Sequence, residues 1–202
     1  RYDGRVKVTG AAKYCGDLKF PNMLYGKMLG SPYAHAKILS IDTSEAMKIP
    51  GVKAVITAKD VPSLKYGISP ARWDENCLCI EKALFVGDKV AAVACVDEET
   101  CYKALKAIKI EWEVLKPVLD YMHADDDDMP QIHEKYAKNI NTEIHQEFGD
   151  IKKAFAEAHY VRTDTFVGQR CYQCPIEPHS AVCIWQDNKL TVYSSTQSVH
   201  YF

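Results

Sequence analysis

The sequence predicts an α+β protein with a larger mixed unit, an acidic connector and the beginning of a second unit. Short apolar runs of strand length, separated by Pro and Gly, fill the opening part of the chain, and a strand, helix and strand pattern follows over residues 89–114. A further helix and further strands are expected after residue 142. The 202 residues, 47% hydrophobic and 26% charged, can bury the core of one domain or of two small ones.

The opening part is expected to form three strands and one short helix. The strand-length apolar runs are 23–29, 37–41 and 52–57. Residues 42–44 (Asp-Thr-Ser) are N-cap candidates for a helix through residues 45–47, which the Pro-Gly pair at 50–51 would end.

The clearest pattern in the chain lies between residues 89 and 114. Residues 89–96 (KVAAVACV) are a nearly unbroken apolar run, which is typical of a buried strand. A helix is expected after residues 97–100, with Ala104, Leu105 and Ile108 on one face. Residues 110–114 (IEWEV) then alternate with the period of a strand, so the two glutamates point away from the apolar side chains.

Composition shifts at residues 120–141, which contain four consecutive aspartates and few aliphatic residues. The aspartate run lacks the alternating ligand spacing and the Gly of a calcium-binding loop, so a solvated, exposed connector is the favoured interpretation.

The second unit is expected to begin with a helix and to continue in strands. Asp150 is a candidate N-cap for a helix whose apolar stripe includes Ile151 and Phe155. The expected strands are 160–167, 181–185 and 190–194, and the last two are joined by a turn with Asp-Asn at its centre. No domain of ordinary size is complete between residues 143 and 202, and the chain lacks an initiator Met, so we expect further residues on a longer polypeptide or on another chain.

Charge and hydropathy narrow the range of partners. The formal net charge is -2 and the Lys and Arg residues are scattered, so nothing in the sequence indicates nucleic-acid binding. The sequence shows no apolar run of membrane-spanning length and no signal-peptide pattern, so a cytoplasmic location without a membrane span is expected, with small molecules or proteins as partners.

The eight cysteines are expected to be free thiols. Cys95 and Cys183 lie in apolar strand-like runs, where Cys behaves as a buried hydrophobic residue. A less favoured alternative is that the pairs at 77/79 and 171/174 together provide four thiolates to zinc or to an iron-sulfur cluster.

Several segments of the first unit resemble one enzyme family in their order and spacing. These are DGRVKVTGAAKY at 3–14, SPYAHAKI at 31–38, PGVKAVIT at 50–57 and FVGD at 85–88. The chain is similar to the amino-terminal part of the molybdenum-cofactor (large) subunit of the xanthine dehydrogenase/aldehyde oxidase family of molybdenum hydroxylases. It departs from the family pattern at Gly30, where Arg is usual, at Lys89, where Pro is usual, and in the spread of a Leu-Pro pair over 115–117.

The resemblance extends into the second unit and implies a domain organisation. The matching segments are EFGDIKKAFAEA at 147–158, PIEPHSAVCIW at 175–185 and KLTVYSSTQSVH at 189–200. The implied organisation is a hammerhead α/β domain at 1–119, the acidic connector at 120–141, and the incomplete first part of a molybdenum-cofactor-binding domain at 142–202.

Gln197 is the site residue that the resemblance indicates. In the family, the Gln of the Ser-Thr-Gln segment lies beside the molybdenum and its amide contacts the apical oxo ligand, which implies a catalytic and cofactor-binding role for Gln197. A neutral amide suits this role because it donates to a strong acceptor without adding charge. Without the resemblance, Gln197 is an exposed polar residue at a strand end, and Glu177 and His179, two apart on one strand, are interpreted as structural.

The resemblance implies an oxidoreductase that hydroxylates an electrophilic carbon with oxygen from water, or runs the reverse dehydroxylation. The substrate would be an N-heterocycle, an aldehyde or an aromatic thioester. Two stretches, residues 143–158 and 67–70, resemble the molybdenum subunit of 4-hydroxybenzoyl-CoA reductase, which runs the dehydroxylation. The expected cofactor is molybdenum-molybdopterin in its cytosine dinucleotide form, bound mainly by later segments of the subunit, with iron-sulfur clusters and FAD on partner chains or domains.

The catalytic glutamate of the family also lies later in the subunit, so these 202 residues alone are expected to be inactive. The alternative is a non-catalytic module that docks an iron-sulfur or flavin electron-transfer subunit.

Overall fold

The computed structural model describes residues 1–67 and 73–197, which fall into two compact units. One unit is Asn22–Gln146. The other combines Arg1–Pro21 with the described residues from Glu147 onward. The opening residues of the chain therefore fold with the hairpin near its end, which the sequence pattern did not indicate.

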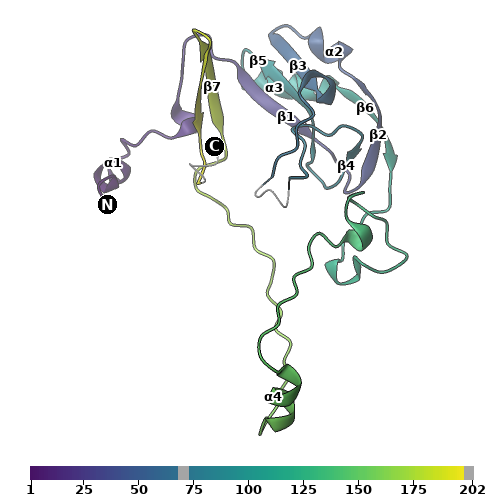
Figure 1. Cartoon of the computed structure of the whole chain (residues 1–202). Coiled ribbons are helices and arrows are strands. Elements are labelled where there is room, and N and C mark those ends of the chain that lie inside the picture. The colour runs from purple at the N-terminus through teal and green to yellow at the C-terminus, as the bar shows by residue number, and fades with distance from the viewer. Residues whose placement is uncertain (68–72, 198–202) are drawn as a thin grey trace. The chain divides into compact units, whose positions relative to one another are not determined.

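The Asn22–Gln146 unit contains two three-stranded antiparallel sheets (Figure 1). The first has the order β1 (Tyr25–Gly30), β5 (Lys89–Cys95), β3 (Val52–Thr57). The second has the order β4 (Lys82–Ala83), β2 (Ala36–Asp42), β6 (Lys109–Val114). Helices α2 (Ser44–Met47) and α3 (Glu98–Ala107) pack against the first sheet. The five strands and two helices expected between residues 23 and 114 are confirmed, and the two-residue strand β4 adds to them.

Strand β5 is central to the first sheet, and side chains on both of its faces are buried. Ala91, Val93 and Cys95 join the core under α3, where Cys101 and Ala104 pack against them. Val90 belongs to a second buried cluster with Cys79 and Ala83, against which Trp112 of β6 packs. Burial on both faces explains why β5 reads as an unbroken apolar run, whereas β6 alternates.

Helix α3 begins at an N-cap that the sequence supplies directly. The Asp97 carboxylate accepts a hydrogen bond from the Thr100 backbone N–H at 2.7 Å. This backbone hydrogen bond lowers the pKa of Asp97 from its ordinary value, because the N–H group stabilises the ionised form.

We predict that Asp97→Ala lowers the thermal unfolding midpoint by roughly a few degrees, because an N-cap oxygen is lost. The lowered pKa also fixes the pH dependence: the stabilisation is complete above the ordinary value of 3.8 and is lost as the pH falls through the lower folded-state pKa. Asp97→Asn keeps an acceptor oxygen but does not titrate, so its midpoint should fall less than that of the parent between pH 5 and pH 2.5. If the midpoints of the parent and of this variant fall equally with pH, ionised Asp97 is not the source of the acid-sensitive stabilisation.

The acidic segment 120–141 has little regular structure, apart from the 3-10 turns η4 (Tyr121–His123) and η5 (Ala137–Asn139). Its aspartates 125–128 are exposed, as expected for a solvated loop. Ion pairs hold the segment to its own unit and to itself: Lys116–Asp128 at 3.4 Å, Lys138–Asp127 at 2.8 Å and Lys82–Glu134 at 3.5 Å. These pairs are exposed at one partner or both, so each contributes little to stability.

The other unit contains α1 (Gly4–Val8), η1 (Cys15–Asp17), α4 (Ile151–Glu157) and a hairpin of β7 (Ala181–Gln186) and β8 (Lys189–Ser194). The predicted helix with Asp150 as its N-cap is confirmed, since the Asp150 carboxylate accepts from Lys153 N at 2.9 Å. The predicted strand at 160–167 is wrong: these residues are irregular and exposed. Their apolar composition favours a strand, but within the described part of the chain they have no strand to pair with.

Candidate functional site

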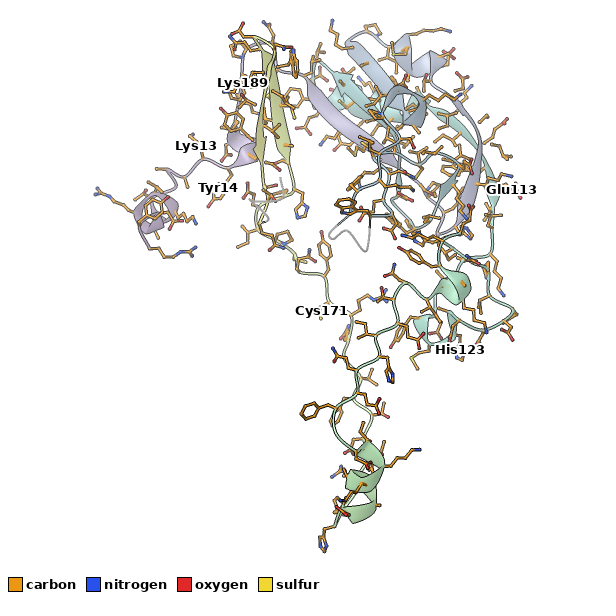
Figure 2. All side chains as sticks on the ribbon, in the orientation of Figure 1. Lys13, Tyr14, Glu113, His123, Cys171 and Lys189 are labelled. Carbon is orange, nitrogen blue, oxygen red and sulfur yellow. The ribbon has the colours of Figure 1, made fainter. Side chains whose placement is uncertain are left out.

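The candidate site is the end of the β7–β8 hairpin from which Gln197 extends. The strands pair in register from Ala181 with Ser194 to Gln186 with Lys189. At the turn, Asp187 and Asn188 have φ of 51° and 59°, which matches the type I′ geometry that two-residue hairpins favour and confirms the predicted Asp-Asn turn. Figure 2 labels Lys189 near the turn, at the opposite end of the hairpin from Gln197.

Gln197 lies in a bend three residues after β8, and it is exposed. The bend is tied to the residues that precede β7. The Ser195 backbone N–H donates to Ser180 O at 3.1 Å, and the Ser180 N–H donates to Ser195 Oγ at 2.8 Å. The Ser195 hydroxyl lies 3.3 Å from the carbonyl oxygen of Pro178, to which it donates. These bonds fix the backbone two residues before Gln197, which is itself exposed.

The expectation that Glu177 and His179 share one strand is wrong, because both residues precede β7, in a segment without regular structure. The Glu177 carboxylate accepts a hydrogen bond from the backbone N–H of Cys15 at 3.3 Å. His179 is exposed. Residues 198–200, the end of the segment that suggested the site, lie outside the described residues, as do residues 68–70 of the stretch 67–70. Sequence reasoning missed the contact of Glu177 with Cys15, because no local pattern links positions 162 residues apart.

The cysteines are free thiols among the residues that the structure describes. Cys95 is buried, as expected, but the expectation for Cys183 is wrong, because Cys183 is exposed on the two-stranded β7–β8 hairpin. Cys77 is exposed and Cys79 is buried. Burial, and then the nearby Asp88 carboxylate, raises the pKa of Cys79 to about 12, since both disfavour the thiolate. Within residues 1–67 and 73–197, no group of three or more His, Cys, Asp or Glu side chains could hold a metal ion.

We predict that a maleimide reagent at pH 8 labels Cys77 and leaves Cys79 unlabelled in the folded protein. Cys77 is exposed, whereas Cys79 is buried and has a pKa of about 12, so its reactive thiolate is scarce. Peptide mapping after labelling distinguishes the two sites, and Cys77→Ser should remove the label from that peptide. Labelling of Cys79 at a rate similar to that of Cys77 would contradict the buried placement.

Comparisons with known proteins give consistent results. Residues 9–116 match the family model for the aldehyde oxidase and xanthine dehydrogenase a/b hammerhead domain, and residues 132–202 match the model for the molybdopterin cofactor-binding domain. A probable xanthine dehydrogenase subunit of Bacillus subtilis is 39% identical over 98% of this chain and 26% of its own length. The nicotinate dehydrogenase large molybdopterin subunit of Eubacterium barkeri is 37% identical over 100% of this chain and 47% of its own length.

Solved structures agree with the sequence comparisons. The crystal structure of quinoline 2-oxidoreductase from Pseudomonas putida 86 matches with a TM-score of 0.86 and 28% identity, over 98% of this chain and 26% of that one. The aldehyde oxidoreductase of Desulfovibrio gigas matches with a TM-score of 0.83 and 33% identity, over 96% of this chain and 23% of that one. The chain thus spans between about a quarter and about a half of the length of the relatives named here.

In the part of the chain that the structure describes, no helix has the length and apolar character needed to cross a membrane.

Proposed function

This chain belongs to the aldehyde oxidase and xanthine dehydrogenase family, and we propose that it forms the amino-terminal portion of the molybdopterin-binding subunit of a molybdenum-dependent oxidoreductase. The reaction would be hydroxylation of an electrophilic carbon with oxygen from water, or the reverse dehydroxylation, on an N-heterocycle, an aldehyde or an aromatic thioester. The observation that carries this proposal is the order of the two matches: a hammerhead domain followed by a cofactor-binding domain, within which the hairpin presents Gln197.

The residues present fit such a cofactor. When bound, the molybdenum cofactor supplies the two-electron redox chemistry of the reaction. Gln197 offers an exposed, uncharged amide donor on a backbone that Ser195 holds in place, which is suitable for an oxo ligand. We assign the hammerhead domain to 1–119, the connector to 120–141 and the first part of the cofactor-binding domain to 142–202.

Several finer features are part of the same proposal. The cofactor would be the cytosine dinucleotide form, held mainly by the remainder of the subunit. Iron-sulfur clusters and FAD would lie on partner chains or domains and would carry electrons away. The complex would be cytoplasmic.

The test is to purify the intact polypeptide that contains this chain, together with its partner subunits. We expect about one molybdenum per subunit, release of cytosine monophosphate on acid hydrolysis, and incorporation of oxygen from isotopically labelled water into the product. A stoichiometric complex that lacks molybdenum and docks an electron-transfer subunit would instead support a non-catalytic module.

A further inference from the structure

A short segment near the start of the chain packs against the β7–β8 hairpin. We call Tyr14–Phe20 the N-terminal strap; it contains η1, which contacts β7. The Cys15 thiol donates to the carbonyl oxygen of Tyr193 at 3.4 Å, and the rings of Phe20 and Tyr193 lie 5.9 Å apart. Figure 2 shows Tyr14, the first residue of the strap, beside the hairpin. Cys15 is 7% exposed and is the one buried residue among the described residues of this unit, so the strap and the hairpin share a minimal core.

Glu177 fastens the strap to the residues that precede β7. Residues 141–176 are all exposed, and Glu177 is the first residue after them that is not. Its carboxylate accepts the hydrogen bond of the Cys15 backbone N–H at 3.3 Å. A backbone N–H beside a buried side chain costs free energy if it has no partner, and a carboxylate is a stronger acceptor than a neutral oxygen.

Hydrogen bonds next to Glu177 connect the residues before β7 with the segment that leads to Gln197. The next residue, Pro178, has its carbonyl oxygen 3.3 Å from the Ser195 hydroxyl that donates to it. Ser195 also pairs with Ser180 through its backbone N–H at 3.1 Å and its hydroxyl at 2.8 Å. Gln197 follows two residues later. A continuous set of contacts therefore links the strap, the residues before β7 and the backbone that presents Gln197.

We propose that Glu177 is a positioning residue that holds the N-terminal strap on the hairpin and thereby fixes the bend at Gln197. The catalytic consequence rests on the proposed function, since it requires Gln197 to serve a bound cofactor. The structural role, in which Glu177 orders two segments far apart in the sequence, does not depend on the proposed function. Glu177 acts through the backbone and contacts neither substrate nor cofactor in this assignment.

The experiment compares four forms of the intact enzyme by hydrogen-deuterium exchange: the parent, Glu177→Ala, Glu177→Gln and His179→Ala. Glu177→Ala should raise amide exchange roughly tenfold in both residues 14–18 and residues 194–197, because the partly buried Cys15 N–H loses its acceptor. Glu177→Gln keeps an acceptor oxygen and should rescue both segments. His179→Ala removes an exposed side chain two residues away and should match the parent.

Steady-state kinetics on the same samples distinguish a loss of positioning at Gln197 from a general loss of folded or cofactor-loaded enzyme. In Glu177→Ala we expect a severalfold lower kcat with KM and molybdenum content unchanged, and recovery in Glu177→Gln. Unchanged exchange in Glu177→Ala, or an increase confined to the strap, would overturn the inference. If both segments exchange faster but Gln197→Ala has the parent rate, the positioning by Glu177 stands and the role proposed for Gln197 fails. If Glu177→Ala does not fold, Glu177→Asp, whose carboxylate is withdrawn by one methylene, should give a smaller increase in the same two segments.

Discussion

Replacing Gln197 with alanine in the complete enzyme should slow reduction of the metal centre by substrate about tenfold to a hundredfold, with molybdenum content nearly unchanged. An amide hydrogen bond to a charged or strongly polarised acceptor contributes roughly 1.5 to 3 kcal/mol. If that bond strengthens in the transition state, its loss corresponds to about one to two powers of ten in rate. Molybdenum content should stay unchanged because Gln197 would not be a ligand of the metal. Its amide would affect the reactivity of the metal centre and not the binding of the cofactor.

The measurement is rapid mixing of oxidised enzyme with substrate, followed at the metal, with molybdenum content determined on the same samples. Gln186→Ala is a matched control, since it removes the same side chain from the turn end of the same hairpin. A Gln197→Ala enzyme that is reduced at the parent rate with full cofactor would show that Gln197 is only an exposed residue after a strand.

The sequence predicted most of the Asn22–Gln146 unit, because local periodicity and burial agree there. Strand β5 reads as apolar because it is covered on both faces, and α3 shows both its cap and its apolar face. The failures fall in the other unit, where residues 160–167 and Cys183 have apolar patterns but no covering layer within the described residues. Pattern reasoning assumes that an apolar run meets a partner, and it was wrong where the described chain supplies none.

The candidate site was predictable in a different and more limited way. Gln197 was identified by resemblance, because an exposed amide after a strand has no pattern of its own. Its support was not predictable from the sequence. The hydrogen bond between Cys15 and Glu177 joins residues 162 positions apart. The sequence pattern places Glu177 on a strand with His179, whereas both residues precede β7. Contacts of this kind depend on tertiary packing, which composition and spacing do not encode locally.

Gly51→Ala should be among the most destabilising single methyl additions in the Asn22–Gln146 unit. Gly51 has a φ of +96°, a conformation that residues with a Cβ adopt only with strain. A Cβ at this position would also lie 2.8 Å from Val96 Cγ2 and 3.3 Å from Thr100 Cγ2. Gly51 cannot easily move away, because its carbonyl oxygen accepts a hydrogen bond from the Val96 N–H at 3.0 Å. Strain and overpacking each cost roughly 1 to 3 kcal/mol, so we expect a total loss of about 2 to 6 kcal/mol.

Amide exchange in β5 and α3 of the intact protein measures this loss locally, without assuming that a multidomain chain unfolds in one step. A loss of about 2 to 6 kcal/mol corresponds to exchange roughly thirtyfold to more than about ten-thousandfold faster through global opening of the unit. Gly87→Ala is the matched control, because Gly87 has a φ of +89° but a Cβ there would meet nothing within 4 Å. Gly87→Ala should introduce only backbone strain, so it should accelerate amide exchange much less than Gly51→Ala does. Equal acceleration in the two variants would show that the contacts with Val96 and Thr100 relax without cost, and that the left-handed backbone alone requires glycine at position 51.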